Sequence, residues 1–531
     1  MILERLQSFF GGSVLEHHKA MAFDCPVTTA PLPDRLHVPI KSYGAAPEPD
    51  LNQRLMVQPG QAVAVGETLL AHQDDAHPAV HASADGVFGG LVETAKPTDP
   101  LMAEHHLVIE VDAGATPTPL PADAPADQCL PTMDSEAIIE RLAHMGVVGL
   151  GGALFPAAEK IRQGSGQIHT LIINGVGCEP YIACDEALMQ LRPRAIIFGA
   201  ELLAQALGAE RIVIALEDPL AETHGSLAAL LSSCAQQRAQ PTCDMDVVIV
   251  PQRFPQGAER QLIQTLTGQQ VPHTGLPQDL GLLVANVATA AASFDAIVHQ
   301  RPVTHRLVTV TGPGVVTPMN VHAPIGLAVS ELIDLAGGGT ADCSRWIMGG
   351  PVSGQAIGDL CVRVDKGTLC VLGLTEAITE TPHATLPCIN CGFCVDVCPS
   401  RLLPQQLFKL AQNGQHGKAH EIGMTDCIEC GLCAEVCPSH LPLLETYRHS
   451  KDWLKVQNMD ERAQQLAKRR HDARQQRIEK EDAARQARRQ ARTERLQSQT
   501  AAQSEIEAAL ARARAKKNRA EGDPPSEESP Q

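Results

Sequence analysis

Two matching cysteine runs near the carboxyl end constrain this 531-residue chain more than any other feature. Both follow the pattern C-x2-C-x2-C-x3-C-P, which is typical of ferredoxins that hold two [4Fe-4S] clusters. Three cysteines in a tight loop can bind one face of a cluster, while the fourth, followed by proline, reaches the other cluster. We therefore expect one cluster to be bound by Cys388, Cys391, Cys394 and Cys437, and the second by Cys427, Cys430, Cys433 and Cys398.

Zinc binding and disulfide formation are the alternatives for these cysteines. Zinc sites usually combine two CxxC pairs and have no use for a third cysteine at this spacing followed by Cys-Pro. Disulfides would need an oxidising compartment, and the first ten residues lack the basic start and sustained apolar core of a secretion signal. The pattern therefore favours an intracellular iron–sulfur protein.

Length and composition predict several domains and no membrane span. A chain with 44% hydrophobic residues has material for more than one core, so three or four domains are expected. The most apolar stretch, 280–298, is interrupted by Asn286, Thr289, Ser293 and Asp295 and is too polar for a bilayer. Any work at a membrane is expected to be done from its surface.

The first 112 residues favour β structure. Short β-branched stretches separated by glycine turns between Val57 and Val87 predict a small all-β module, similar to the barrel-sandwich fold of biotinyl and lipoyl carriers. Such a carrier needs a lysine at the turn between its halves, and the segment 71–79 contains none. We expect a structural docking module at 1–112, followed by a linker rich in Pro and Ala at 113–133.

Residues 134–300 alternate between helical and strand-like patterns. This alternation indicates an α/β layer with a mostly parallel sheet, in which ligands bind at the carboxyl ends of the strands. Four loops are therefore of interest: 146–156, 174–181, 255–262 and 286–289. The expected helices are Ser135–Met145 and Ala195–Leu207, and the expected strands are Thr170–Asn174, Arg211–Ala215 and Asp246–Val250.

The loop 146–156 is dense in glycine. Without side chains, its backbone amides can approach a phosphate or a flavin ring closely, and the start of the following helix favours anions. A glycine-rich loop can also be only a turn. Both interpretations stay open on this loop alone.

Further motifs resemble the RnfC (RsxC) family of the Rnf/Rsx ion-translocating oxidoreductase complexes. The resemblance extends over about residues 1–451 and includes both cysteine runs. Its other motifs are Gly149–Pro156, Ile173–Tyr181, Leu266–Gly268 with Val271-Pro272, Ile347–Pro351 and Leu402–Gln406.

The resemblance implies a multidomain α/β and α+β protein. It implies an amino-terminal barrel-sandwich-like module, a domain like the flavoprotein of respiratory complex I that binds FMN and NADH, and a two-cluster ferredoxin-like domain. A small β-grasp-like module would precede the clusters. The corresponding ranges are 134–300 for the FMN/NADH-type domain, 301–375 for the β-grasp-like module and 380–450 for the two [4Fe-4S] clusters.

The family also implies an activity and a place in the cell. It implies a peripheral subunit on the cytoplasmic side of the inner membrane, which passes electrons from NADH through FMN and the clusters. The expected partners are the other subunits of the membrane complex and a ferredoxin-like redox protein, and electron flow is coupled to movement of Na+ or H+. No nucleic acid is expected.

Six residues are candidates for the FMN and NADH site. Gly149, Gly151, Gly152 and Lys160 would lie near the flavin phosphate, and Glu179 and Glu259 would be polar ligands in the pocket. The alternatives are a surface role for Lys160 and, for Glu179, a helix cap or a turn salt bridge.

Three positions depart from the usual motifs of the family. Leu154 replaces a glycine and is expected to crowd a flavin or force the loop away. Gly177 removes a carboxylate that could orient a nicotinamide, and Ala258 stands where glycine is common. Two hypotheses follow: an input subunit with FMN and NADH, or an electron-relay and docking subunit with a degenerate α/β domain that binds no flavin.

The segment 451–531 differs from the rest in charge. Between Lys451 and Ala520 there are 19 Lys/Arg against 10 Asp/Glu, although the whole chain has a net charge of −18. The absence of Gly and Pro from this stretch predicts a long exposed helix or a helix-prone disordered segment. It could tether the protein to anionic lipid or an acidic partner, or serve as a solvated spacer, and the interspersed acids favour the spacer.

Overall fold

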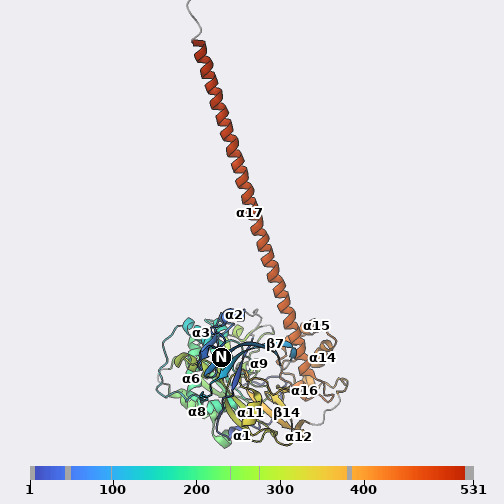
Figure 1. Cartoon of the computed structure of the whole chain (residues 1–531). Helices are drawn as coiled ribbons and strands as arrows, with labels where there is room; N and C mark the ends of the chain where they lie inside the picture. The colour runs from blue at the N-terminus through green and yellow to red at the C-terminus, as the bar shows by residue number, and fades with distance from the viewer. Residues whose placement is uncertain are drawn as a thin grey trace, which may run out of the picture. The chain divides into compact units, whose positions relative to one another are not determined.

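The computed structural model describes residues 6–41, 50–96, 99–238, 241–273, 275–379 and 385–520. The chain divides into two units, Met1–Leu454 and Lys455–Gln531, and the boundary falls inside the last helix, α17 (Leu443–Ala520). Figure 1 follows the chain from α1 to α17. Together the elements form the expected multidomain α/β and α+β protein.

An antiparallel sheet forms most of the amino-terminal module. Its strand order is β2-β7-β6-β3, and β4 and β5 form a separate antiparallel pair. Residues 112–134, which follow β7, contain no helix or strand. The elements are α1 Ala20–Phe23, β2 Arg35–Ile40, α2 Leu51–Arg54, β3 Ala62–Val63, β4 Thr68–Leu70, β5 Val80–His81, β6 Gly86–Lys96 and β7 Asp99–Val111.

A parallel sheet in the order β10-β9-β8-β11 forms the α/β layer. Its central strands are runs of buried aliphatic residues, as expected for a sheet covered on both faces. The three strands predicted from the sequence are confirmed as β8, β9 and β10. The strands are β8 Thr170–Gly175, β9 Arg211–Leu216, β10 Asp244–Ile249 and β11 Leu282–Asn286.

Local signals define the helices of this layer. The Asp134 carboxylate accepts a hydrogen bond from Ala137 N at 2.8 Å and starts α3, while Gly208, with φ +72°, ends α6 in the left-handed conformation. Both helices predicted from the sequence are confirmed. The helices are α3 Ser135–His144, α4 Ala157–Gly164, α5 Cys184–Leu191, α6 Pro193–Leu207, α7 Ala221–His224, α8 Leu227–Gln236, α9 Glu259–Thr267, η1 Pro277–Leu280 and α10 Val287–Val298.

A mixed sheet in the order β1-β13-β12-β16-β14-β15 follows the α/β layer. Strand β1 comes from the amino-terminal segment and pairs in parallel with β13, so the two regions share one sheet. No pattern in the sequence indicated this pairing. The elements are β1 Thr28–Thr29, β12 His305–Thr311, β13 Met319–Pro324, α11 Val329–Leu335, β14 Cys343–Met348, β15 Gln355–Ile357, β16 Cys370–Thr375 and α12 Glu376–Thr379.

The cysteine-rich region is a set of short helices around a small core of its own. Leu407, Phe408 and Met424 are buried there, and Tyr447 at the start of α17 donates its hydroxyl hydrogen to Pro404 O at 2.6 Å. The elements are α13 Phe393–Asp396, α14 Pro404–Gln412, α15 His416–Glu421, η2 Met424–Asp426 and α16 Leu432–Glu435.

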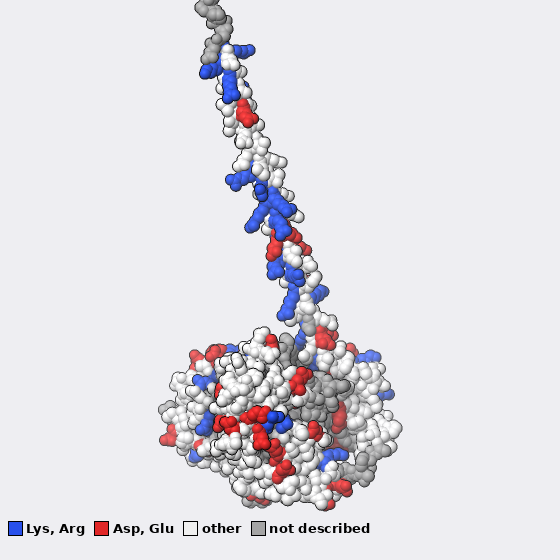
Figure 2. Space-filling model, viewed as in Figure 1, with Lys and Arg blue, Asp and Glu red and all other residues white. Residues whose placement is uncertain are grey.

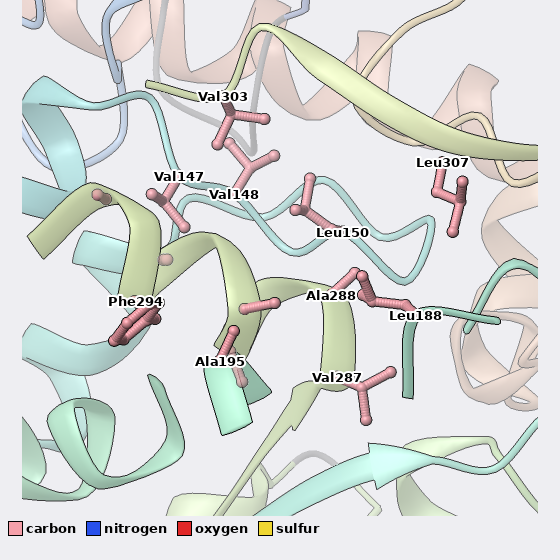
Figure 3. Close-up of a cluster of buried hydrophobic side chains, with 14 of the residues drawn as sticks. Val147, Val148, Leu150, Leu188, Ala195, Val287, Ala288, Phe294, Val303 and Leu307 are labelled. Atoms are coloured by element: carbon pink, nitrogen blue, oxygen red, sulfur yellow. The ribbon is translucent and has the colours of Figure 1, made fainter. Parts of the chain in front are cut away.

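The glycine-rich loop is supported by the main hydrophobic core. Val147, Val148 and Leu150, which alternate with its first glycines, are buried in the same cluster as Ala288 and Phe294 of α10 (Figure 3). The core therefore holds the apolar residues on one side of the loop, and the glycines lie on the opposite side. This places the loop next to the end of β11, where α10 begins.

Residues 455–519 of α17 are exposed wherever their side chains are described. This agrees with the long exposed helix expected from the composition. Across the described ranges, no helix combines the length and the apolar character needed to cross a bilayer.

Candidate functional site

A cavity of about 850 Å³ lies at the carboxyl ends of β8 and β11. Its wall is built by all four loops singled out in the sequence, together with the turn after β14 and the second cysteine motif. This is the position at which open α/β sheets bind ligands, and the volume is within the usual range for cofactor sites. Wall residues include Gly149, Gly151, Lys160, Glu179, Glu259, Asn286, Ser353 and Cys430.

The glycine-rich loop contributes backbone to this cavity. Gly149 and Gly151 line it, and a Cβ added to Gly151 would lie 3.1 Å from the Cβ of Asn286. Gly152 has φ +96° and does not line the cavity, although a Cβ there would lie 3.8 Å from Leu369, which does. The structure therefore brings two of the three predicted glycines to the cavity.

Leu154 does not occupy the cavity. Its backbone has φ +59°, a conformation in which glycine is the usual residue, and its side chain packs against Gly367. A Cβ at Gly367 would lie only 3.0 Å from Leu154 Cγ, so the leucine and the glycine fit together. The expected crowding of the pocket by this leucine does not appear, because the side chain points into a space outside the wall.

Lys160 and Glu259 form an ion pair in the wall of the cavity. Lys160 Nζ lies 3.0 Å from Glu259 Oε1 and donates to Val284 O at 2.8 Å. Both side chains are a little over one third exposed, so the pair is accessible to a ligand. A phosphate could take the place of the carboxylate as the partner of the ammonium group.

Glu179 is held by a turn from a different domain. Its carboxylate accepts hydrogen bonds from Val352 N and Ser353 N, both at 3.0 Å, and from the Ser353 hydroxyl at 2.9 Å. Burial raises the pKa of Glu179, and these hydrogen bonds oppose the rise. Glu179 thus lines the cavity while it also fastens the turn after β14 to the loop after β8.

A buried ion pair lies directly beneath Gly177. Lys19, from the amino-terminal segment, contacts Glu186 and donates to Ile182 O at 2.7 Å, and both charged side chains are almost fully buried. A Cβ at Gly177 would clash with Glu186 Oε1 and with Lys19 Nζ. A larger residue at this position would require the Lys19 and Glu186 side chains to shift, because the pair fills the space.

The carboxyl groups at this end of the cavity are unusually buried. Desolvation raises the pKa of Asp185, opposed by Arg306, and that of Glu186, opposed by Lys19.

The residues around Asn286 include some that the sequence indicated and some that it did not. Asn286 ends β11, caps α10 through a bond to Ala288 N at 2.8 Å, and donates to Asp185 Oδ2 at 2.7 Å. Its loop was among the four singled out in the sequence, although strand β11, which ends at Asn286, was not predicted. Lys19, Asp185 and Ser353 were missed, since no local pattern links them to the site.

Each cysteine motif surrounds a small cavity together with one cysteine of the other motif. Asn390 and Glu429 both adopt φ between +54° and +58°, and Gly392 and Gly431 have φ of +90° and +82°, so the two loops share one backbone shape. One cavity is lined by Cys388, Cys391, Cys394 and Cys437, and the other by Cys427, Cys430, Cys433 and Cys398. Four thiols around one cavity are a suitable donor set for a [4Fe-4S] cluster.

The two cysteine cavities differ in their surroundings. Around the first, Cys388 and Cys391 are exposed, and Ile389 and Phe393 are 66% and 54% exposed. The cysteines of the second are less accessible, and Ile428, Glu429 and Cys430 also belong to the wall of the large cavity. The inner cysteine cavity therefore adjoins the large cavity, and the outer one adjoins solvent.

Residues at the start of α17 hold the second cysteine motif against the rest of the site. Glu429 lies 2.8 Å from Lys451 Nζ and 3.2 Å from Arg448 Nε, and Arg448 also donates to Ser353 O at 2.6 Å. These cations lower the pKa of Glu429 against the effect of burial. The turn that holds Glu179 is thus also bonded to the helix that follows the second cysteine motif.

These features define the class of protein: a flavoprotein-like α/β domain joined to a dicluster ferredoxin-like domain, as in proteins that transfer electrons. Four family models agree with this architecture. They are the RnfC barrel sandwich hybrid domain (7–114), the Nuo51 FMN-binding domain (142–294), the SLBB domain (307–356) and the 4Fe-4S dicluster domain (387–441). The expected fold class and the two [4Fe-4S] clusters are confirmed.

Curated relatives identify the family. The ion-translocating oxidoreductase complex of Salmonella gallinarum has a subunit, designated C, that is 36% identical over 518 residues, which are 97% of this chain and 74% of the relative. The chain belongs to the family of these subunits, the RnfC family. Its counterparts in Pseudomonas aeruginosa and Cronobacter sakazakii are 37% and 38% identical, and the chain spans 61% and 64% of their lengths.

Among solved structures, the NAD+-reducing [NiFe]-hydrogenase in its H2-reduced state aligns with 52% of this chain and 53% of its own. The sequence identity is 18% and the TM-score 0.42, a likeness too weak to support an argument.

Proposed function

We propose that this chain is the peripheral electron-input subunit of a membrane complex that couples electron transfer between NADH and a ferredoxin-type partner to ion translocation. One observation carries the proposal: the wall of the large cavity contains both the glycine-rich loop and Cys430, a proposed ligand of the inner cluster. A cofactor held by that loop would adjoin the inner cluster. We place the subunit on the cytoplasmic side of the inner membrane, as the family resemblance implies.

The residues of the large cavity would hold FMN and NADH. The exposed backbone at Gly149 and Gly151 would let a flavin approach, and Lys160 would bind its phosphate in exchange for Glu259. Glu259 would then be free to accept hydrogen bonds from a nucleotide. Bound FMN would supply the chemistry that the protein lacks, accepting a hydride and releasing single electrons.

The cysteines would hold the two clusters in the crossed arrangement predicted from the sequence. Cys437 would complete the outer cluster and Cys398 the inner one. The first cysteine motif is exposed and the second lies beside the large cavity, which supports electron flow from the cavity outward through the chain. The inner cluster would be the acceptor nearest the flavin, and the outer cluster would meet the partner.

The second hypothesis, a relay and docking subunit without flavin, is favoured by one observation. Glu179 uses its carboxylate to fasten the turn at Val352 and Ser353, and Lys160 and Glu259 are paired with each other. All three residues therefore have a structural partner of their own. In that case electrons would enter through a ferredoxin-like protein.

Spectroscopy on the purified full chain with reconstituted clusters distinguishes the two hypotheses. We expect bound FMN in the absorption spectrum after incubation and desalting, and bleaching of the cluster absorbance when NADH is added. Clusters that NADH leaves unchanged and only dithionite reduces, in protein that retains no FMN, would reject the input-subunit proposal in favour of the relay.

A further inference from the structure

The arginines of α17 are arranged on one side of the helix. Between residues 470 and 495, seven arginines recur at intervals of three, four or eight residues. With about 100° of rotation per residue, they fall within an arc of roughly 80°, over a length of about 37 Å. We call this set the arginine stripe: Arg470, Arg474, Arg477, Arg485, Arg488, Arg492 and Arg495.

The acids of the same stretch lie mostly on other sides. Of the five acids between 470 and 495, only Glu481 falls on the stripe, where it lies 3.8 Å from Arg477. The others are Asp472, Glu479, Asp482 and Glu494, about 60° or more beyond its edges by the same helical geometry. The interspersed acids therefore dilute the charge of the helix as a whole but not that of this face. Figure 2 shows basic side chains outnumbering acidic ones along α17.

Exposed apolar side chains continue the same face at both ends. Val456, Met459 and Leu466 precede the stripe, and Ile506 and Leu510 follow it, with exposures between 41% and 60%. By the same rotation per residue they lie over or beside the line of the stripe. The face thus consists of a cationic centre between two apolar ends.

We propose that this face of α17 binds an anionic phospholipid surface. Guanidinium groups form paired hydrogen bonds with phosphate, and a row of them on a straight helix can meet many headgroups at once. Apolar side chains at the ends can enter the boundary between headgroups and acyl chains. Along the stripe, the apolar side chains Ile478 and Leu496 lie only at one edge, so the centre of the face is cationic rather than apolar, which disfavours an acidic protein as the partner.

Binding of the full chain to vesicles tests this. The vesicles contain about three parts phosphatidylcholine to one part phosphatidylglycerol, and pure phosphatidylcholine serves as the comparison. The stripe variant R474Q/R485Q/R488Q/R492Q is matched by K468Q/R469Q/K480Q/R489Q, which removes the same charge from outside the stripe, between residues 468 and 489. Circular dichroism checks that both variants keep their helix content.

We expect the chain to co-sediment with the anionic vesicles and the stripe variant to bind at least about tenfold more weakly at low salt. The matched variant should lose clearly less. Equal loss in both variants would overturn the proposal, because net charge alone would then explain binding. No preference for phosphatidylglycerol, or stripe-dependent binding only to a soluble polyanion such as polyglutamate, would also overturn it.

Discussion

The cysteine-rich region and the wall of the large cavity are built in different ways. Each cysteine loop takes its shape from adjacent residues, and the second repeats the first with left-handed residues at Asn390 and Glu429. The cavity wall depends on contacts between distant segments, such as Lys19 with Glu186 and Glu179 with Ser353. The shape of each cysteine loop therefore depends mainly on nearby residues, whereas the cavity wall depends on contacts among three domains.

Cys398 and Cys437 are each proposed to complete the cluster of the other motif, so they connect two loops that are distant in the sequence. Replacing either cysteine is expected to give the largest effect. Cys398→Ser should remove the inner cluster, which is bound mainly by the other motif, and Cys437→Ser should remove the outer one. Each variant should lose about half of the iron, since four cysteine ligands are the usual requirement for a [4Fe-4S] cluster. Iron analysis and electron paramagnetic resonance of the reduced protein check this.

The paired variants serve as controls for each other. If Cys398→Ser removes only the signal assigned to the cluster of its own motif, with Cys437→Ser doing the same for the other, the crossed assignment is wrong.

Lys19→Met tests the cavity wall, which depends on contacts between distant segments. The substitution would leave Glu186 buried without its cation, which typically costs about 3–5 kcal/mol. Because Lys19 joins the amino-terminal segment to α5, we expect a lower unfolding midpoint and a less ordered cavity wall. The midpoint can be followed by circular dichroism with increasing denaturant.

A double variant keeps this test specific. K19M/E186Q removes both charges and should recover much of the lost stability, because no buried charge is left alone. If it is as unstable as the sum of K19M and E186Q measured separately, the two residues are not coupled and the ion pair is not what supports the wall.

These two regions also explain what the sequence could predict. The cysteine spacing and the buried strand predicted to end at Asn174 are local patterns, and they led to the correct loops. Lys19 could not be found, because nothing in its neighbourhood relates it to a glutamate 167 residues away. The side-chain direction of Leu154 was also out of reach, since it depends on the space beside Gly367.

A buried histidine pair in the mixed sheet, outside the wall of the large cavity, is expected to make the fold sensitive to acid. His305 of β12 and His322 of β13 stack with ring centroids 4.9 Å apart, near the Arg192–Asp295 pair. Burial lowers the pKa of His305 to about 3 and that of His322 to about 4. Between about pH 4 and 6.5 the unfolded chain binds more protons than the folded one, so stability is full above 6.5 and falls as the pH falls.

We expect a loss of about 1 kcal/mol per histidine for each pH unit in that window. H305Q/H322Q should flatten the dependence of the unfolding midpoint on pH, whatever it does to the midpoint itself. His471, exposed on α17, provides the control: H471Q should leave the dependence unchanged. An unchanged slope in H305Q/H322Q would show that other groups cause the acid sensitivity.

The exposed pair Lys160–Glu259 should behave in the opposite way to the buried pair Lys19–Glu186. Because both side chains are about one third exposed, Lys160→Met should change the free energy of unfolding by less than about 1 kcal/mol. If Lys160 binds the flavin phosphate, the same variant should weaken FMN binding, by roughly fivefold for the loss of about 1 kcal/mol. Titration of the full chain with FMN, followed by flavin fluorescence, measures the affinity, and Lys160→Arg should retain most of it. Equal affinities for the wild type and Lys160→Met would remove Lys160 from the site, and the glycine-rich loop would then have to bind the phosphate through its backbone alone.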